Sequence, residues 1–585
     1  MRRLLVVPLL LLAGALLPAG VATAHPERNT SFPSIDLKPP APGAIPKYRS
    51  SGPSVVVCKP ESRRLLQRIY KGKGPKTRRI LKSRLKTLKR CRFRDIQPAV
   101  NAAKTGDRVL LMPGVYEEIP SRKIPFGSYQ DGSTCGNDYV LTEGFNSAPP
   151  PVGPRSNDPP VRPDRNHQVK CPNAKNLIEV VGDPTPEADP INPSLPKCLQ
   201  KCNLQIEGLG KKPEDVLIKG DRKKSDVLRV DRAWGIYLRN FAVEQSAFNN
   251  IDLVEVNGFR ISKIVSRYAQ DYGVLSFAST NGLYDHVVAY NNGDSGIYPG
   301  STEKGCNVNP NLYGTCGAFA GPAAALGDGN RGCAFYSIEI RDSESYGNTL
   351  GYSGTAGNST YVHDNDFHDN ATGLSTDSFA AGHPGMPQEC VKWENNRIRS
   401  NNNNIFTREH QKFCADTPFG LRPREMVCPQ FQTPVGTGII IAGGNRNLIR
   451  ENHIYDNHRV GALLFGVPAA LRGDYDPTHQ TDTSNGNRFL DNIMGADPAG
   501  KRVPNGREFI WDEQGSGNCW EGNRMRSGAA HAPSPSALPA CPGATVQQVT
   551  NLAVLAPMLA CSAWDPKNLT NPPACDWFTT PVKPS

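Results

Sequence analysis

Between residues 250 and 466, short apolar segments recur at a nearly constant interval. Each segment opens with a small or polar residue, usually glycine, directly followed by an apolar one. These marker pairs are Asn250-Ile251, Gly273-Val274, Gly296-Ile297, Gly351-Tyr352, Gly373-Leu374, Asn404-Ile405, Gly438-Ile439 and Gly461-Ala462. Their spacings are 23, 23, 55, 22, 31, 34 and 23 residues, so we interpret the short ones as single coils and the long ones as a coil plus an insertion. One coil cannot bury its own apolar face, so the pattern predicts stacked coils about 4.8 Å apart around a shared core.

Asparagine recurs at the turn that precedes these segments. Asn292, Asn348, Asn370 and Asn457 occupy this place. In stacked coils such residues lie above one another, where each side-chain amide can both donate to and accept from its neighbours. A period of 22 to 23 residues is too short for a propeller blade, and the chain lacks the leucine pattern of leucine-rich repeats.

The segment RDIQPAVNAAKTGDRVLLMPGVYEE (94 to 118) precedes the repeats. It combines a short amphipathic helix (Ile96, Val100, Ala103) with an apolar strand at 109 to 112, flanked by two turns. This pattern resembles the N-terminal cap of pectate-lyase-like right-handed parallel β-helices, including the NosD-like repeat family. NNGDSGIYPGS (291 to 301) is also similar to uncharacterised actinobacterial β-helix proteins.

The resemblance covers roughly residues 94 to 523 and implies an all-β solenoid, a right-handed parallel β-helix. Residues 119 to about 215 are rich in proline and irregular, so we expect a large insertion there, with the coils resuming at 216. The resemblance further implies an extended groove for a polysaccharide along the coil axis. Fold analogy of this kind does not establish a site.

The two ends of the chain differ in composition from the coils. Arg2 and Arg3, an apolar run and Ala22-Thr23-Ala24 predict a signal peptide over residues 1–24, and hence a secreted protein, extracellular or attached to the cell wall. No later stretch approaches about 20 apolar residues, so we expect no membrane span. Residues 25–57 are interpreted as a proline-rich linker, and 524–585, rich in Pro and Cys, as a cap or tail.

The sixteen cysteines are an even number, which is typical of paired cysteines in an oxidising compartment. None has metal-ligand spacing supported by histidines, so we expect disulfide-stapled loops and not zinc sites.

The positive charge of the chain is concentrated in one segment. Of the formal net charge of +12, residues 59 to 94 contribute +15, since sixteen Lys and Arg stand against Glu61 alone. Apolar residues at helical spacing on both sides of a KGKGP break predict a basic helical hairpin at 58–93, closed by Cys58 and Cys91. Two interpretations remain open, a solvated cationic face and a patch for a cell-wall polyanion or acidic glycan. We expect no nucleic-acid partner, because only Tyr70 interleaves the charges.

Two aspartates occupy equivalent places on adjacent coils. Asp271 and Asp294 lie two positions before their markers, which predicts carboxylates about one strand spacing apart. Such a pair could hold Ca²⁺, which takes oxygen ligands. The alternative is that both simply cap local backbone amides in turns.

A second row, four positions after the marker, carries the candidate chemistry. Here the spacing predicts Asp377 and Arg408 on adjacent coils, with Glu409 and His410 next to Arg408. Two carboxylates, a guanidinium and an imidazole in one groove could do acid/base work on a glycan. The alternative is a surface salt bridge between Asp377 and Arg408 beside incidental loop residues.

Three further residues are expected to bind substrate beside this row. They are Tyr298 and Ser301 on a neighbouring coil and His383 in the loop after Asp377. The insertions at 306 to 333, around Cys390 and from Cys414 to Cys428 are predicted to leave after the marker strand, and insertions on one face of a solenoid commonly build its binding surface.

These features favour a carbohydrate-active enzyme, either a polysaccharide lyase or a glycoside hydrolase. In a lyase, an aspartate would hold Ca²⁺ against a uronate, and Arg408 or His410 would take the proton. In a hydrolase, Asp377 and Glu409 would be the acid and base. The competing hypothesis is a non-catalytic surface protein that binds cell-wall glycan or serves as a spacer.

Overall fold

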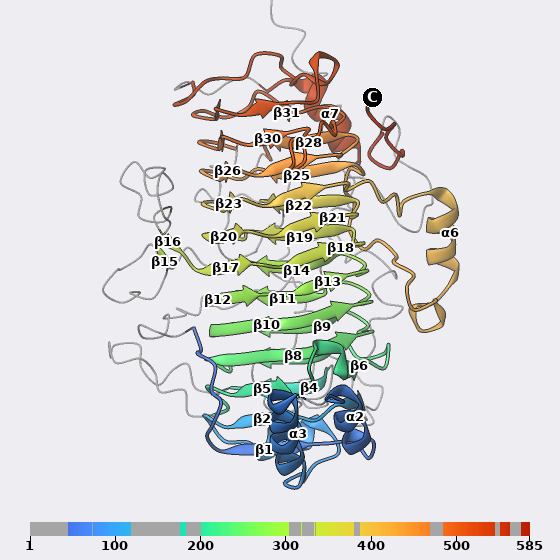
Figure 1. Ribbon diagram of the computed structural model, residues 1–585. Helices are drawn as coiled ribbons and strands as arrows, with labels where there is room; N and C mark the ends of the chain where they lie inside the picture. The colour runs from blue at the N-terminus through green and yellow to red at the C-terminus, as the bar shows by residue number, and fades with distance from the viewer. Residues whose placement is uncertain are drawn as a thin grey trace, which may run out of the picture.

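The computed structural model describes residues 45–118 except 73, 176–182, 200–302, 317–318, 333, 335–379, 387–467, 484–544, 550–561 and 575–585. Over these residues the chain winds into a tall stack of coils whose strands all run in parallel between neighbouring turns (Figure 1). The right-handed parallel β-helix implied by the pectate-lyase-like resemblance is therefore the observed fold. His383 and the signal peptide lie outside the described residues.

One long face of the stack is a ten-stranded parallel sheet, here called sheet B. Its strands are β4 (Asn176–Val181), β7 (Asp226–Asp231), β9 (Asn249–Val254), β11 (Val274–Phe277), β14 (Ser295–Gly300), β19 (Leu350–Thr355), β22 (Thr372–Asp377), β25 (Thr437–Ala442), β28 (Val460–Phe465) and β31 (Phe509–Trp511). Ile251 pairs with Val274 and Val274 with Ile297, as the marker pairs predict. The same register continues through Tyr352 and Leu374.

The other faces form a 21-stranded sheet, sheet A, that is bent along its length into two rows. The first row contains β1 (Ser54–Val57), β2 (Arg108–Leu111), β5 (Gln205–Gly208), β12 (Thr280–Asp285), β17 (Ile338–Arg341), β20 (Thr360–His363), β23 (Lys392–Glu394), β26 (Leu448–Arg450), β29 (Arg488–Leu490) and β32 (Cys519–Glu521). The second contains β3 (Gly114–Glu117), β6 (Val216–Lys219), β13 (Val288–Tyr290), β18 (Glu344–Tyr346), β21 (Asp366–His368), β24 (Arg397–Arg399), β27 (His453–Tyr455), β30 (Ile493–Met494) and β33 (Arg524–Met525). The long strands β8 (Ile236–Glu244) and β10 (Asn257–Arg267) run through both rows. A separate antiparallel pair, β15 (Gly317–Ala318) and β16 (Phe335–Tyr336), stands beside the stack.

The core is a single apolar column inside the coils. It extends from Val57 in the first strand to Trp520 near the last, and fully buried Tyr352 and Trp393 fill its middle. At its N-terminal end, α4 (Ile96–Ala102) places Ile96 and Val100 in the same cluster. The Glu118 carboxylate accepts hydrogen bonds from the Ile96 and Gln97 amides at 2.6 and 3.2 Å, so it satisfies the free N–H groups at the start of this capping helix.

Asparagine ladders run along the turns, as the sequence predicts. In the turn before sheet B, side-chain amides connect Asn292, Asn348, Asn370, Asn401 and Asn457 at 2.9 to 3.1 Å, and Asn457 continues to Asn505 at 3.2 Å. A second ladder, which we did not predict, joins the two rows of sheet A through Asn365, Asn396, Asn452, Asn492 and Asn523. All of these rungs except Asn523 are fully or almost fully buried, so the amides satisfy one another where water cannot.

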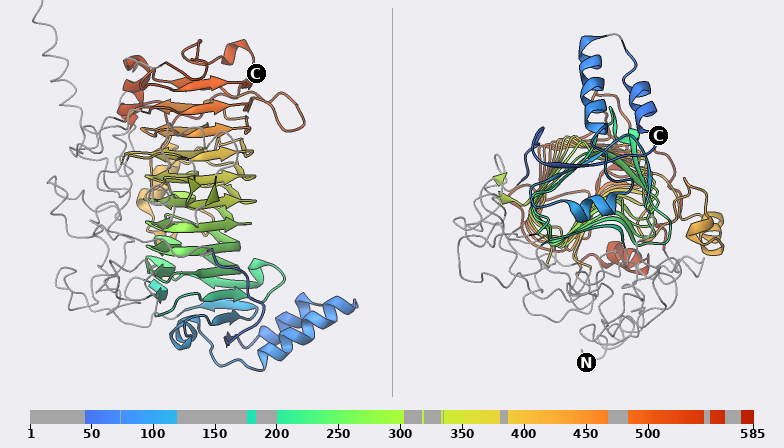
Figure 2. Two further views of the ribbon diagram at one scale, coloured as in Figure 1. Left: turned by 90° about the vertical axis from the view of Figure 1, so that its left-hand side faces the viewer. Right: turned by 90° about the horizontal axis from the view of Figure 1, so that it is seen from below.

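The basic hairpin is confirmed as two helices, α2 (Ser62–Ile69) and α3 (Pro75–Leu88), closed by the Cys58–Cys91 disulfide. Leu66 and Tyr70 bury their side chains against Leu110 and Met112 of the first coils. Figure 2 shows the two helices standing out from the N-terminal end of the stack.

Three boundaries differ from the sequence prediction. Residues 54 to 57, assigned to the linker, form β1, because Val56 and Val57 bury their side chains. The predicted irregular insertion at 119 to 215 contains two coil strands, β4 and β5. The coils are therefore already present before residue 216. Asn404-Ile405 is not a coil marker, since Leu374 pairs directly with Ile439. Residues 402 to 436 instead form an insertion that carries α6 (Arg408–Asp416) and a 3-10 turn (Phe419–Leu421).

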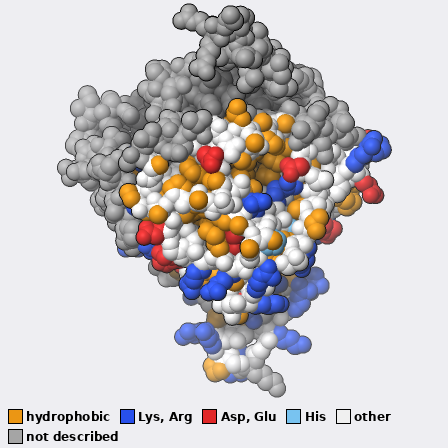
Figure 3. All heavy atoms as spheres, turned by 90° about the horizontal axis from the view of Figure 1, so that it is seen from above, with side chains coloured by type: hydrophobic (Ala, Val, Ile, Leu, Met, Phe, Trp, Pro, Cys, Tyr) orange, Lys and Arg blue, Asp and Glu red, His pale blue; other side chains and the backbone are white. Residues whose placement is uncertain are grey.

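The C-terminal residues close the stack and also return along it. Leu538 packs against the core column beyond the last coil, and Cys541 is bonded to Cys519. Seen from this end, apolar side chains occupy much of the middle of the end face (Figure 3). Helix α7 (Leu552–Cys561), by contrast, packs with Trp577 and Phe578 on the outer side of sheet B, where it covers Leu463 and Phe465. The predicted tail is thus part of the wall of the solenoid.

The prediction of disulfide-stapled loops is confirmed in the described part of the chain. Besides the hairpin disulfide and Cys519–Cys541, the pairs Cys333–Cys390, Cys414–Cys428 and Cys561–Cys575 join segments around the coils. No free cysteine is found among the described residues. A search of the described helices also finds none that is both long and apolar enough to cross a bilayer.

Candidate functional site

The outer face of sheet B brings together side chains from all ten of its strands. Successive strand residues point to opposite faces, so the residue after each inward-facing marker points outward. In register, this outward row reads Glu179, Arg229, Asp252, Leu275, Tyr298, Ser353, Ser375, Ile440, Leu463 and Ile510. The face therefore changes from charged, through aromatic and hydroxyl-bearing, to apolar along the coil axis.

A pocket opens where the hydroxyl-bearing stretch meets the apolar one. About 520 Å³ around it is free of protein atoms, and this volume includes space open to solvent. Its lining consists of Ser375, Asp377, Phe379, Phe431, Gln432, Thr433, Pro434, Ile440, Ala442, Phe465 and Trp577. Sheet B supplies the floor, and the walls come from the insertion before β25 and from the C-terminal segment.

The walls are fastened to the floor by hydrogen bonds. The hydroxyl groups of Thr433 and Thr372 lie 2.7 Å apart, and the Val435 N–H donates to the Trp577 carbonyl at 3.0 Å. Arg459 donates to the Trp577 and Thr579 carbonyls as well. The pocket is thus built from three segments far apart in sequence but bonded together.

Asp377 is the acidic group of this pocket. Its Oδ2 atom accepts from the Thr355 hydroxyl at 2.8 Å and its Oδ1 atom from the Phe379 N–H at 3.0 Å. The side chain is buried, with 3% exposed, so these donors fix its orientation in a largely apolar surrounding. A carboxylate held in this way can accept hydrogen bonds or a proton from a bound molecule.

The predicted partners of Asp377 are not beside it in the sheet. Its neighbours in register are Thr355 and Ala442, so the expected adjacency to Arg408 is wrong. Arg408 and Glu409 are exposed in the first turn of α6. The His410 ring contacts the Val427 carbonyl within the same insertion. The Asn404-Ile405 pair has the sequence of a marker but lies in an insertion. Counting it as a coil placed Arg408 beside Asp377, where the structure has Ala442.

Tyr298 and Ser301 lie on the same side of the molecule as Asp377, as expected. Tyr298 precedes Ser375 by two coils in the outward row, and its ring centroid is 4.8 Å from that of Tyr272. The Ser301 N–H donates to the Thr355 carbonyl at 2.9 Å, next to the group that holds Asp377. With Phe248, Leu275 and Phe277, the two tyrosines form an aromatic cluster on the face of sheet B.

Asp271 and Asp294 do occupy equivalent turns of adjacent coils. The Asp294 N–H donates to the Asp271 carbonyl at 3.0 Å, and the Ser295 hydroxyl donates to the Asp294 carboxylate at 2.6 Å. Both side chains are buried. Within the described residues, no group of three metal-ligating side chains includes either aspartate, whereas Ca²⁺ takes six to eight oxygen ligands. Calcium binding by this pair stays a prediction.

A buried ionic cluster that was not expected from the sequence lies at the N-terminal end of sheet B. Arg229 donates to Asp252 at 2.9 Å and to Asp231 at 3.1 Å, and lies within 3.8 Å of Glu179. Burial raises the pKa of Glu179 well above its usual range. Burial also acts to raise the pKa of Asp231, but Arg232 and Arg229 outweigh it and the pKa is lowered. These residues lie on three different strands and meet only through the strand register, so no local sequence motif predicts the cluster.

The insertion with α6 lies along the edge of sheet B where its strands begin. We predicted that the Cys414–Cys428 segment leaves after the marker strand, but it precedes β25 and follows β24. It runs back over several coils, where the Gln430 N–H donates to Gly293 at 2.9 Å and Arg424 pairs with Glu244. In Figure 1 this segment stands out beside β18 and β21. It therefore borders sheet B at the edge where its strands begin, opposite to the edge where β14 and β22 end.

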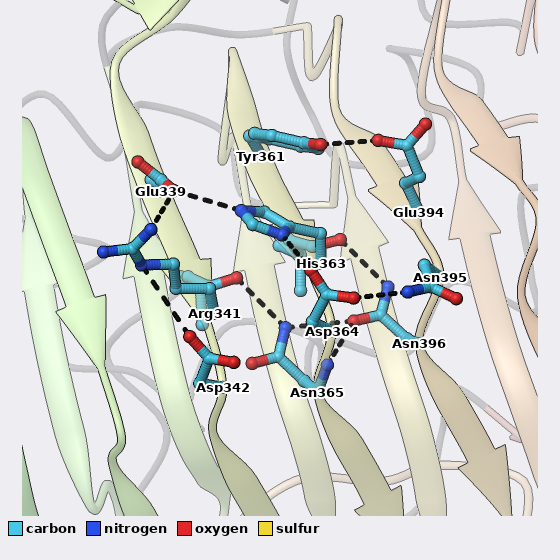
Figure 4. Close-up of polar contacts among 12 residues, drawn as sticks. Glu339, Arg341, Asp342, Tyr361, His363, Asp364, Asn365, Glu394, Asn395 and Asn396 are labelled. Atoms are coloured by element: carbon cyan, nitrogen blue, oxygen red, sulfur yellow. Dashed lines mark hydrogen bonds and ion pairs between the residues drawn. The ribbon is translucent and has the colours of Figure 1, made fainter. Parts of the chain in front are cut away.

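A second group of polar side chains lies on the outer face of sheet A (Figure 4). Tyr361 donates to Glu394 at 2.5 Å, and Lys392, almost fully buried, lies 2.9 Å from the same carboxylate. The net effect on Glu394 is a lowered pKa. Burial alone would raise it, but the hydrogen bonds from Tyr361 and Lys392 outweigh burial. Burial and the bond to Glu394 raise the pKa of Tyr361, which keeps the phenol protonated.

The charges of this group neutralise one another across the coils. Glu339 is paired with His363 at 3.0 Å and with Arg341 at 3.7 Å, and Arg450 is paired with Glu394. Acids and bases on neighbouring coils face one another, as expected of ion pairs that hold strands in register. We therefore place the candidate site on sheet B and assign this group a structural role.

Comparisons with known proteins give structural likeness at very low identity. No protein-family model matches the chain, and no curated protein matches it in sequence. Solved structures that resemble it include ORF18 of Geobacillus virus E2 (11% identity, 73% of this chain, 57% of that chain, TM-score 0.34). They also include the A-module of the Azotobacter vinelandii mannuronan C-5 epimerase AlgE4 (12%, 74%, 90%, 0.36) and pectate lyase Pel9A (8%, 81%, 77%, 0.29). The chain thus spans little more than half of the viral protein, and its own site has to be judged on its own residues.

Proposed function

We propose that this protein is a secreted, carbohydrate-active β-helix protein that takes a polysaccharide along the outer face of sheet B, with one sugar unit in the Asp377 pocket. The observation that carries this proposal is the pocket itself, in which a fixed, buried carboxylate faces the aromatic side chains of Phe379, Phe465 and Trp577. Such concave sites with few, well-placed polar groups are the usual place for a ligand.

The pocket chemistry suits a sugar ring. Aromatic side chains can cover the apolar C–H faces of a pyranose, while Asp377 accepts hydrogen bonds from its hydroxyl groups. Gln432 and Thr433 add polar atoms to the wall. The aromatic cluster at Tyr298, two coils away on the same face, is buried and packs within the wall of the solenoid.

If the protein cleaves its ligand, Asp377 is the group in the described pocket that can transfer a proton. In a lyase reaction on a uronate polymer, Asp377 could instead hold Ca²⁺ against the substrate carboxylate, and a second group would have to take the C5 proton as the bond to the leaving sugar oxygen breaks. In hydrolysis a second carboxyl group is needed opposite Asp377. Glu409, exposed on α6, is a weaker candidate for that role than the sequence suggested.

A non-catalytic glycan-binding protein is the second candidate function. It is favoured by one observation: among the described lining residues, Asp377 is the sole acidic or basic side chain. A pocket with one carboxylate and several aromatic rings can bind sugars without cleaving them.

The test is a panel of polysaccharides incubated with the purified protein, with Ca²⁺ or with a chelator. Unsaturated uronate absorbance reports lyase activity, new reducing ends report hydrolysis, and retention on immobilised glycan reports binding. Asp377→Asn preserves the shape of the side chain and removes its charge, and Glu409→Gln is the matched control on α6.

Cleavage that falls at least about 100-fold in Asp377→Asn and stays unchanged in Glu409→Gln would support an enzyme with its centre at Asp377. Binding without cleavage, weakened by Asp377→Asn alone, would support the glycan-binding function. Equal behaviour of both variants, or no binding to any glycan, would overturn the proposal.

A further inference from the structure

The segment from residue 59 to residue 94, here called the basic arm, concentrates positive charge at one end of the stack of coils. Fifteen of its sixteen cations are described, and thirteen of these are exposed. The exposed ones are Arg63, Arg64, Arg68, Lys71, Lys76, Arg78, Arg79, Lys82, Lys86, Lys89, Arg90, Arg92 and Arg94. With Glu61 as its one acid, the arm has a formal charge of +15 on a chain whose total is +12.

These charges do not stabilise the arm. Arg78, Lys82 and Lys86 follow one another at i, i+4 spacing on α3, where like charges repel and disfavour the helix. Among the described cations of the arm, Lys59 alone forms an ion pair, at 3.0 Å from Asp95. The arm is held instead by its disulfide and by its apolar contacts with the first coils. Fourteen of the fifteen described cations form no ion pair with a described acidic group of the protein, so this charge pattern, which costs stability, calls for an external partner.

The arm is also placed to meet a large partner. It packs on the outer side of sheet A, through Leu110 and Met112, whereas α7 and the Asp377 pocket lie on the outer side of sheet B. The end-on view in Figure 2 shows the two helices projecting from one side of the coils and α7 on the opposite side. With 14 residues, α3 extends for about 21 Å. A polymer bound along it would leave the pocket accessible.

We propose that the basic arm binds a linear anionic polysaccharide and tethers the protein to it. Nine of the sixteen cations are arginines, which bind carboxylates with two parallel hydrogen bonds. The described arm exposes no large apolar side chain that could enter a bilayer. Its one tyrosine, Tyr70, is buried and cannot stack on bases. Exposed cations in a segment that exposes no large apolar or aromatic side chain match a partner with one charge on each repeating unit.

The experiment measures binding of the full chain to polygalacturonate by the shift in its dissociation constant. The test variant is Arg78→Gln/Lys82→Gln/Lys86→Gln. A matched control, Lys211→Gln/Lys212→Gln/Lys223→Gln, removes three exposed cations outside the arm. A third variant, Arg78→Lys/Lys82→Arg/Lys86→Arg, keeps the charge and guards against loss of the helix.

The test variant should weaken binding at least about tenfold and reduce its salt dependence, because fewer counterions are released. The control and the charge-conserving variant should each bind within about twofold of the unchanged protein. Weakening by the control as large as by the test variant, or binding by the test variant that stays within about twofold, would overturn the proposal. So would tighter salt-sensitive binding to duplex DNA or to phosphatidylglycerol vesicles than to polygalacturonate, which would assign the arm to another partner.

Discussion

The Nε2 atom of His363 lies 3.0 Å from Oε1 of Glu339 on the preceding coil, and its Nδ1 atom lies 2.7 Å from Asp364. His368, in the other row of sheet A, repeats the arrangement with Glu344 at 3.0 Å. Burial lowers the pKa of both histidines, but the hydrogen bonds to these carboxylates outweigh it, and both pKa values are raised. The two imidazoles therefore bind two successive coils together most strongly when they are protonated.

The first prediction concerns pH. A raised folded-state pKa contributes stability that is complete below the unfolded histidine pKa and is lost as the pH rises through the folded value. The free energy of unfolding of the unchanged protein should therefore exceed that of His363→Gln/His368→Gln at about pH 5, and the difference should shrink above about pH 7. Denaturant titrations across this range test it. His286→Gln, on an exposed side chain, serves as the control, and a difference that grows toward alkaline pH would contradict the assignment.

The second prediction concerns the asparagine ladder. Asn401 accepts from Asn370 at 3.0 Å and donates to Asn457 at 3.1 Å, and it is fully buried. Asn401→Ala removes the acceptor of the Asn370 N–H and a donor to the Phe367 carbonyl as well as the two ladder bonds, at a cost of about 1 to 3 kcal/mol for each buried group left unpaired. The exposed Asn403→Ala should change the free energy of unfolding by less than about 0.5 kcal/mol. Equal effects of the two changes, measured by chemical denaturation, would argue against the ladder as a stabilising element.

Much of this architecture follows from the sequence, because one coil dictates the next. The small or polar residue before an apolar one located β9, β11 and β14 correctly, and the recurring asparagines located the ladder before sheet B. The pattern failed at Ile405, which is buried against the C-terminal segment and not in the coil. An apolar residue inside an insertion looks the same as a marker when only its neighbours in sequence are considered.

The candidate site was less predictable for the same reason. Asp377 was found because it lies on a marker strand, whereas the walls of its pocket come from residues 431 to 434 and from Trp577, more than 50 and close to 200 residues away along the chain. Contacts of this kind depend on how insertions fold back, and repeat spacing carries no information about that. The cluster around Arg229 escaped notice because its markers lie before the stretch where the repeat is regular.

The third prediction concerns that cluster. Arg229 is the central cation among four carboxylates, Glu179, Asp226, Asp231 and Asp252, all within 3.8 Å of its guanidinium. Arg229→Met leaves these buried acids without their shared partner, which should cost about 3 to 5 kcal/mol at neutral pH. The loss should be smaller near pH 5, because the acids can then take up protons. Thermal melts at both pH values test this, and the exposed Arg526→Met is the control.

The fourth prediction concerns the space inside the pocket, and the Asp377 carboxylate is left unchanged. Ala442 lies next to Asp377 in register and lines the floor. Ala442→Phe should fill the space between Phe465 and Asp377 and weaken glycan binding or cleavage at least about tenfold, with the arm-dependent binding to polygalacturonate unaffected. Ala530→Phe, at an exposed position near the C-terminal end, should change neither. Full activity of Ala442→Phe would place the glycan elsewhere on the molecule.

The asparagine ladder has a consequence for how such a molecule can vary. Asn292 and Asn348 are 56 residues apart and Asn348 and Asn370 only 22, yet their amides are joined at 2.9 and 3.0 Å. The pitch of the stack is therefore independent of how much chain is inserted between two rungs. An insertion between two coils can therefore be exchanged for another while the asparagine ladder keeps the coils in place. Specificity could be redesigned, or acquired in evolution, through such exchanges of loops.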